Sequence, residues 1–246
     1  MIIDLNADLG EECGDDAAIF PYLTSANIAC GAHAGGVRSM DIALADASRH
    51  GVTVGAHVGY EDRANFGRIA VDATRAELTE SIRVQIERLM SRAARFNVRV
   101  RYVKPHGALY HRVASDAMQA CALVDAVRAC DPTLELLVPF SPLLLETAGP
   151  LRCRHEFFAD RGYHLNGQLV PRSDARAHVE TSQQVVNRTL EWLRTGEVLS
   201  VEGKSMRIFA DSICLHGDSQ NSVETARTLH ASLVAHDVRI ASWFAA

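Results

Sequence analysis

The fold prediction starts from Tyr102-Val103-Lys104-Pro105-His106-Gly107-Ala108-Leu109-Tyr110. This stretch continues an apolar, β-branched run at 98–103 that is typical of a buried strand. Pro105 cannot donate a hydrogen bond to a sheet, so we expect the strand to end there. Lys104 and His106 then lie at the carboxyl end of a strand, where α/β folds carry their binding and catalytic groups. A turn with two solvated side chains is the alternative for this stretch taken alone.

The same order of apolar run, polar motif and helix recurs along the 246 residues. This alternation predicts a largely parallel sheet with helices outside it. We predict strands at 2–5, 26–30, 52–55, 98–103, 134–138, 155–163 and 212–215, with a last short strand at 238–241. We predict helices at 15–23, 40–50, 74–93, 115–127, 182–193 and 222–235. The sequence shows no internal repeat and no low-complexity linker, so residues 1–246 are expected to form a single (β/α) barrel domain.

Composition excludes several classes of protein. The net charge of −5 and the lack of a Lys/Arg cluster argue against nucleic acid or an anionic membrane as a partner. No apolar run reaches the roughly 18 residues that a membrane span needs. The N-terminus has neither the basic nor the apolar region of a signal peptide. The six cysteines include no C-x-x-C pair, which speaks against a zinc knuckle or a redox motif. We therefore expect a cytoplasmic protein.

Polar residues follow most of the predicted strands. If the sheet closes into a barrel, all carboxyl ends of its strands meet on one face, and these residues converge. Four of the histidines lie close to glycines, which is hard to explain by packing alone. The converging residues are Asn6, Asp8, Glu11, His33, His57, Lys104, His106, Asp160, Arg161, His216 and Asp218.

Two further stretches bear on the site. Asp160 and Arg161 follow two phenylalanines, and they form either a structural ion pair or an anion clamp. The turn-rich segment 163–172 is predicted to be a hairpin or a lid over the site. The motif at 203–205 has the tail of a phosphate-binding loop, but the leading glycine is replaced by Val198 and a strand is expected after it. We therefore predict no P-loop.

Several motifs together resemble the LamB/YcsF family, in the family's order and over nearly the whole chain. The longest of them is Val103-Lys104-Pro105-His106-Gly107-Ala108-Leu109-Tyr110. The others are Asn6-Ala7-Asp8-Leu9-Gly10-Glu11, Ser25-Ala26-Asn27-Ile28-Ala29-Cys30-Gly31, His33-Ala34-Gly35, Gly55-Ala56-His57, Phe66-Gly67-Arg68, Phe158-Ala159-Asp160-Arg161 and His216-Gly217-Asp218.

The resemblance implies a fold and an activity. The fold is an irregular seven-stranded (β/α) TIM-like barrel, related to the barrels of polysaccharide deacetylases. The activity is that of an ATP-hydrolysing 5-oxoprolinase, which opens the cyclic amide of 5-oxo-L-proline to L-glutamate and works with separate B and C subunits. Some motifs depart from the family pattern: position 36 is Gly where the family usually has Asp, and position 69 is Ile where it usually has Arg. The substrate could therefore differ from 5-oxoproline.

The implied reaction suggests roles for the matching residues. Lys104 and Arg161 are expected to bind a carboxylate or a phosphate. Asp8 with His33, His57 or His106 would orient water or hold a divalent metal ion. Asp160, Asp218 and His216 complete the expected catalytic set, with Asp218 orienting His216. The expected substrate-binding residues are Asn6, Glu11, Asn27, Arg68 and Tyr110.

The residues leave alternatives open. ATP, with Mg²⁺, is the expected cofactor, although the missing P-loop is compatible with another subunit binding it. A second interpretation is a metal-dependent amidohydrolase or deacetylase that works without ATP, since Asp and His at strand ends suit zinc or a similar ion. A third is a subunit without catalytic activity that binds substrate for a partner.

Overall fold

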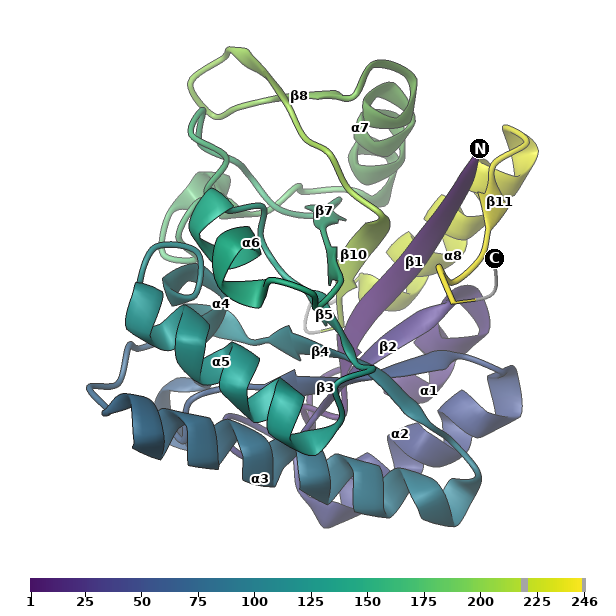
Figure 1. Ribbon diagram of the computed structural model, residues 1–246. Helices are drawn as coiled ribbons and strands as arrows, with labels where there is room; N and C mark the ends of the chain where they lie inside the picture. Colours follow the sequence, from purple (N-terminus) through teal and green to yellow (C-terminus); the bar gives the residue numbers. More distant parts are fainter. Residues whose placement is uncertain (218–220, 245–246) are drawn as a thin grey trace.

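The strands form a parallel sheet that curves into a nearly closed barrel (Figure 1). The computed structural model describes residues 1–217 and 221–244. Along the sheet the order is β6-β5-β4-β3-β2-β1-β10-β7, and neighbouring strands of this path are parallel. These strands are β1 (Ile2–Leu9), β2 (Ser25–Ala29), β3 (Thr53–Val58), β4 (Val100–Pro105), β5 (Glu135–Leu137), β6 (Cys153–Arg154), β7 (Glu156–Phe158) and β10 (Ser212–His216). The short β11 (Arg239–Ile240) pairs with the start of β1.

The two edges of the sheet meet at His155. This residue alone separates β6 from β7, the two ends of the sheet path. Since β6 pairs with β5 and β7 pairs with β10, one stretch of chain joins both edges. The His155 carbonyl accepts hydrogen bonds from the backbone of Asp211 (2.8 Å) and Ser212 (3.2 Å), which fixes the change of partner. With β6 and β7 counted as one, the eight strands of the path make seven, so the predicted irregular seven-stranded barrel is confirmed.

Helices cover the outside of the barrel, with α2, α3 and α5 over β2 to β4 (Figure 1). The helices are α1 (Asp16–Ile19), α2 (Val37–His50), α3 (Arg75–Ala93), α4 (Gly107–Arg112), α5 (Ala117–Cys130), α6 (Pro142–Ala148), α7 (Ser182–Thr195) and α8 (Ser222–Ala235). Short 3-10 turns occupy Phe20–Tyr22, Arg63–Asn65, Ala94–Phe96 and Ala175–Ala177. A two-stranded antiparallel hairpin, β8 (Glu197–Leu199) and β9 (Ser205–Arg207), lies beside α7.

Local signals in the sequence account for many of these helices. Thr74 caps α3 as predicted, because its hydroxyl accepts from the Glu77 backbone N–H while the Glu77 side chain accepts from the Thr74 backbone N–H. α7 and α8 also begin where they were predicted. α4 and α6 were not predicted, and neither was β6. None of the helices among the described residues is both long enough and apolar enough to cross a membrane.

The inward-facing side of β1 is polar, and two strands extend further than the sequence predicted. β1 runs to Leu9 instead of Leu5, and β3 runs to Val58 instead of Gly55. In β1 the buried Asp4, Asn6 and Asp8 alternate with buried apolar residues, so one face of the strand lines the barrel and the other packs on helices. The polar residues of this stretch therefore do not end the strand; they form its inner face.

Candidate active site

A cavity of about 500 Å³ opens at the carboxyl ends of the barrel strands. This is the place where α/β barrels carry their chemistry. Nine of the fourteen predicted site residues line it: Asp8, Glu11, His57, Arg68, Lys104, His106, Tyr110, Arg161 and His216. His33 and Asp160 lie behind this wall, in contact with residues that line the cavity. The structure therefore brings eleven of the fourteen residues to the cavity or directly behind its wall.

Four buried residues form a compact cluster: Glu11, His33, His57 and His106. One potential ligand atom from each lies within 4.8 Å of all the others. The Glu11 Oε1 atom is 3.2 Å from His33 Nε2, 3.3 Å from His106 Nδ1 and 3.6 Å from His57 Nε2. Asp8 Oδ2 approaches the same group and lies 3.3 Å from His57 Nε2. These donor atoms, imidazole nitrogens and carboxylate oxygens, are typical ligands of a divalent transition metal.

In two of the histidines, the ring nitrogen that points away from the cluster lies against a backbone carbonyl oxygen. His57 Nδ1 lies 3.2 Å from the Lys104 carbonyl oxygen, and His106 Nε2 lies 2.9 Å from that of Phe66. Because a carbonyl oxygen only accepts, each of these nitrogens must carry the hydrogen. In the neutral rings the lone pairs of His57 Nε2 and His106 Nδ1 then face each other across 2.9 Å. Such a contact needs a cation between or beside the two atoms, either a proton on one ring or a metal ion.

His33 packs flat against His106. Their ring centroids are 3.9 Å apart, and the planes differ by 3°. Burial lowers the pKa of His33 to about 4 and that of His106 well below its usual value, so both rings are neutral at neutral pH. A Cβ atom at Gly67, where φ is +65°, would lie 2.7 Å from the Cβ of His33. A second glycine, Gly59, allows equally close approach to His33 Nδ1. These glycines let the backbone enclose the cluster.

Lys104 lies inside the barrel, not at its rim. Its ammonium nitrogen is 2.8 Å from Asp8 Oδ1, 2.9 Å from Glu156 Oε2 and 3.3 Å from Cys214 Sγ. The ammonium donates hydrogen bonds to Asp8 Oδ1 and Cys214 Sγ, whereas its contact with Glu156 is an ion pair by charge and distance. Burial alone would lower the pKa of Lys104, but Asp8 and its other neighbours raise it well above the ordinary value. Lys104 thus lines the cavity with its ammonium paired to two carboxylates.

Two predicted substrate-binding residues lie beneath the cavity instead of on its wall. Asn27 Nδ2 donates to Asn6 Oδ1 and to Asp8 Oδ1, at 2.7 Å each. Asn6 Nδ2 donates to Ser212 Oγ (2.6 Å), and Tyr102 OH donates to Asn27 Oδ1 (2.6 Å). Both asparagines are fully buried. Their side chains hold the Asp8 carboxylate in place. They do not line the cavity, because they lie on the inward-facing sides of β1 and β2.

Asp160 and His216 form a pair beside the cavity. Asp160 Oδ1 lies 3.0 Å from His216 Nδ1, and Asp160 Oδ2 accepts a hydrogen bond from the His216 backbone N–H at 2.9 Å. Although Asp160 is buried, His216 lowers its pKa to about 2. The carboxylate therefore orients the imidazole, whose other nitrogen remains for the cavity that His216 lines. Asp218, which was expected to orient His216, lies outside the described residues.

Arg161 supports the wall opposite the cluster. Its Nε donates to the Ala177 carbonyl at 3.0 Å and its Nη2 donates to the Val170 carbonyl at 2.7 Å. The segment 163–172 forms the predicted hairpin, in which Tyr163 and Leu169 make an antiparallel bridge. Residues 168–172 of this hairpin line the cavity.

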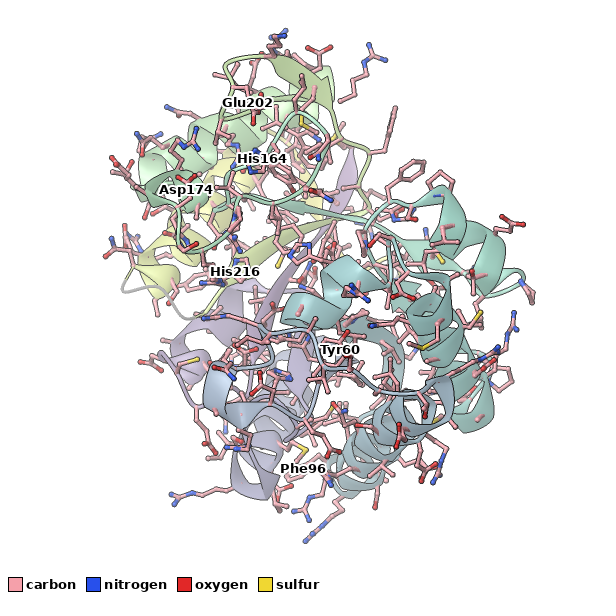
Figure 2. All side chains as sticks on the ribbon, turned by 90° about the vertical axis from the view of Figure 1, so that its left-hand side faces the viewer. Tyr60, Phe96, His164, Asp174, Glu202 and His216 are labelled. Atoms are coloured by element: carbon pink, nitrogen blue, oxygen red, sulfur yellow. The ribbon has the colours of Figure 1, made fainter. Side chains whose placement is uncertain are left out.

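The hairpin is also tied to the turn between β8 and β9. His164 Nδ1 lies 2.6 Å from Glu202 Oε1, and the Leu165 backbone N–H donates to Glu202 Oε2 at 3.0 Å. Figure 2 shows His164 and Glu202 close together above His216. The cavity wall is thus connected to a surface hairpin outside the barrel.

Some residues at the site were not predicted. Glu156 is buried and pairs with Lys104, while Phe158, His111, Arg112 and Arg172 line the cavity. A carboxylate directly before two phenylalanines is costly to bury without a partner, and that signal could have singled out Glu156. His111 and Arg112 lie in α4 and Arg172 lies in the hairpin, and no pattern in the sequence marked these three residues. Phe158 ends β7 and belongs to the motif at 158–161.

Known proteins resemble this chain over nearly its whole length. A protein of Pseudomonas syringae pv. tomato, named as an A subunit of 5-oxoprolinase, is 44% identical over 238 residues, which cover 94% of this chain and 93% of the relative. The protein of the same name from Neisseria meningitidis is 40% identical over 242 residues, which cover 98% of this chain and 99% of the relative.

Solved structures share the fold. The lactam utilization protein from Thermus thermophilus has a TM-score of 0.91 and 35% identity, and the match covers 99% of this chain and 100% of that one. A putative cellobiose-phosphate cleavage protein from Enterococcus faecalis has a TM-score of 0.56 at 9% identity, over 99% of this chain and 98% of that one, which shows a shared fold only. The model of the LamB/YcsF family matches residues 3–246. This confirms the resemblance seen in the motifs, and the chain belongs to the LamB/YcsF family.

Proposed function

We propose that this chain is the subunit of an ATP-dependent 5-oxoprolinase in which the lactam of 5-oxo-L-proline is opened to L-glutamate. The observation that carries the proposal is the buried Glu/His cluster at the floor of the cavity, in a chain 40–44% identical to two proteins named as A subunits of 5-oxoprolinase. The proposed partners are the B and C subunits of that enzyme. The proposed location is the cytoplasm, which agrees with six cysteines that are all free in the structure.

The chemistry requires activation of a stable amide. In the proposed reaction ATP phosphorylates the lactam oxygen and leaves as ADP, one water adds to the carbonyl carbon, and the C–N bond breaks to leave an acyl phosphate. A second water hydrolyses this acyl phosphate to the carboxylate and inorganic phosphate. The ring nitrogen takes a proton and becomes the amino group of glutamate. Since the sequence has no P-loop, we propose that the partner subunits bind ATP with Mg²⁺ and that this chain provides the cavity for ring opening.

The described residues suit distinct tasks in this reaction. Asp8 and the cluster lie at the cavity floor, where a carboxylate can accept a proton from water. His216, oriented by Asp160, is placed to give a proton to the leaving nitrogen. Arg68 and Arg161 line the cavity and supply positive charge for the carboxylate or phosphate of the substrate.

The cluster also fits a divalent metal ion. The facing lone pairs of His57 and His106 need a cation, and the buried His33 Nδ1 atom has no hydrogen-bond partner within the described residues. Asp8 and Glu11 at the floor and Glu156 behind it carry three negative charges against the one ammonium of Lys104, which gives a net charge of −2 when the histidines are neutral. Glu11, His33, His57 and His106 would hold the ion, with Asp8 beside them. A bound ion of this kind polarises a carbonyl and lowers the pKa of water.

Reconstitution tests the proposal. Glutamate release from 5-oxoproline is measured with the chain alone and with its B and C partners, each with and without ATP. We expect turnover only with all three subunits and ATP. Metal content of the purified chain, measured by mass spectrometry before and after chelation, tests the cluster; a matched His57→Ala variant should lose the bound ion.

A second function is favoured by the same cluster. Buried histidines and carboxylates at a cavity floor also suit a metal-dependent amidohydrolase that needs no ATP. Rapid hydrolysis of 5-oxoproline or another amide by the chain alone, without ATP, would support that function instead. A chain that binds 5-oxoproline but whose His57→Ala and Asp8→Asn variants leave the complex fully active would be a binding subunit only.

A further inference from the structure

We propose that Glu156 is a positioning residue for the reaction, which acts through Lys104 on Asp8. The inference rests on the proposed function of the cavity. It concerns Glu156, which does not line the cavity wall. Glu156 opens β7 on the far side of Lys104 from Asp8, and its side chain is fully buried. The three residues come from β1, β4 and β7, so the ion pairs cross the barrel interior.

The titratable groups near Glu156 are the Lys104 ammonium, the Asp4 carboxylate, the Cys214 thiol and the phenols of Tyr102, Tyr110 and Tyr163, and Lys104 is the cation among them. Phe157 and Phe158 follow it, and its charge helps to raise the pKa of the buried Tyr110 and Tyr163 phenols. An apolar side chain would fill this place without the cost of burying a charge. The carboxylate is therefore better explained by the ammonium that it contacts.

The two carboxylates share the ammonium almost equally, at 2.8 Å for Asp8 and 2.9 Å for Glu156. This sharing matters because Asp8 has two oxygens with different tasks. Asp8 Oδ1 receives Lys104 and Asn27, whereas Asp8 Oδ2 faces His57 Nε2 at 3.3 Å. Without Glu156, the Lys104 ammonium would lose one of the two carboxylates that hold it in place, and Asp8 Oδ1, which accepts its hydrogen bond, would lose its fixed position. Glu156 thus keeps Asp8 available at the cavity floor.

The test compares Glu156→Gln with a matched control in the reconstituted complex. Gln keeps the size and an acceptor for Lys104 but removes the charge. The control is Glu135→Gln, because Glu135 is also a buried strand carboxylate in an ion pair, 2.9 Å from Arg154 Nε, but it does not line the cavity. The measurements are kcat and KM for each variant.

We expect Glu156→Gln to lower kcat by about 10- to 100-fold, as is typical for residues that support a first ligand or base. KM should stay within about twofold, because Glu156 does not line the cavity and therefore does not touch substrate. Glu156→Asp should restore part of kcat, and Glu135→Gln should leave kcat near the wild-type value. An unchanged kcat in Glu156→Gln, or a loss no greater than in Glu135→Gln, would overturn the inference.

A failure of the proposed function gives a different result. In that case the wild-type complex itself releases no glutamate from 5-oxoproline. The link between Glu156 and Lys104 is then tested in the isolated chain by denaturant unfolding of Lys104→Met, Glu156→Gln and the double variant. We expect the double variant to be more stable than Lys104→Met alone, because it leaves one buried carboxylate fewer without a partner. If the effects of the two substitutions on the free energy of unfolding were strictly additive, the coupling would be refuted.

Discussion

Replacing Lys104 by Met tests the electrostatic arrangement of the barrel interior. Met is similar in length to Lys but has no N–H group, so Asp8 and Glu156 would remain buried without their shared cation. From the sequence alone, a Lys at a solvated rim would tolerate this change with an unaltered melt. The structure predicts the opposite, because Lys104 is only 1% exposed.

The expected size of the effect follows from this burial. Breaking a buried ion pair by removing one partner costs about 3–5 kcal/mol. That is a large part of the roughly 5–15 kcal/mol by which a typical domain is stable. For a chain of this size, one kcal/mol corresponds to about 2–4 °C in the melting temperature, so Lys104→Met should melt roughly 6–20 °C below wild type.

The assay is thermal and denaturant unfolding of the purified chain, followed by circular dichroism. The matched control is Lys204→Met, because Lys204 is an exposed lysine in the turn before β9 and its loss should change stability by no more than about 0.5 kcal/mol. Lys104→Met together with Glu156→Gln should recover part of the loss. A Lys104→Met chain that melts with wild type would show that Lys104 is not the counter-ion of two buried carboxylates, and the charge count at the cavity floor would fail with it.

Three further predictions concern other parts of the barrel. Burial raises the pKa of Asp4 from 3.8 to about 6, so the folded chain holds this proton more tightly than the unfolded chain and loses stability as the pH rises through that range. The stability of Asp4→Asn relative to wild type should therefore grow by up to about 3 kcal/mol between pH 4 and pH 8 in denaturant titrations, and a constant difference would argue against a raised pKa. Gly67→Ala puts a Cβ 2.7 Å from the Cβ of His33 at a φ of +65°, so both the stability of the chain and its metal binding should fall. The control is Gly203→Ala, which has a φ of +76° but open space around it and should lower stability only. Asp160→Asn should lower kcat of the complex, since the amide has one acceptor oxygen and cannot accept from both the backbone N–H and the Nδ1–H of His216; a kcat equal to wild type would remove His216 from the proton transfer.

The sequence by itself determined the class of fold and the location of the site. Hydrophobic periodicity, the Thr74 cap and the repeated order of strand, polar motif and helix are local features, and they depend on residues close together in the chain. They predicted a parallel barrel whose strand ends converge, and the structure brings Asp8, His57, His106 and His216 to one cavity. The long motif at 103–110 indicated the LamB/YcsF family, and the match of the family model to residues 3–246 confirms it.

Only the tertiary structure decided which residues are partners. The polar face of β1 lies inside the barrel because β2 and β10 flank it, with Asp8 in register with Asn27 and with His216. The change of strand partner at His155 closes the ring and brings Glu156 across from Lys104. Pairs such as these join residues dozens of positions apart, and their geometry depends on the registers of several strands at once. A one-residue shift in any strand would turn its side chains to the other face, so no local pattern could have assigned Lys104 to Glu156 or His216 to Asp160.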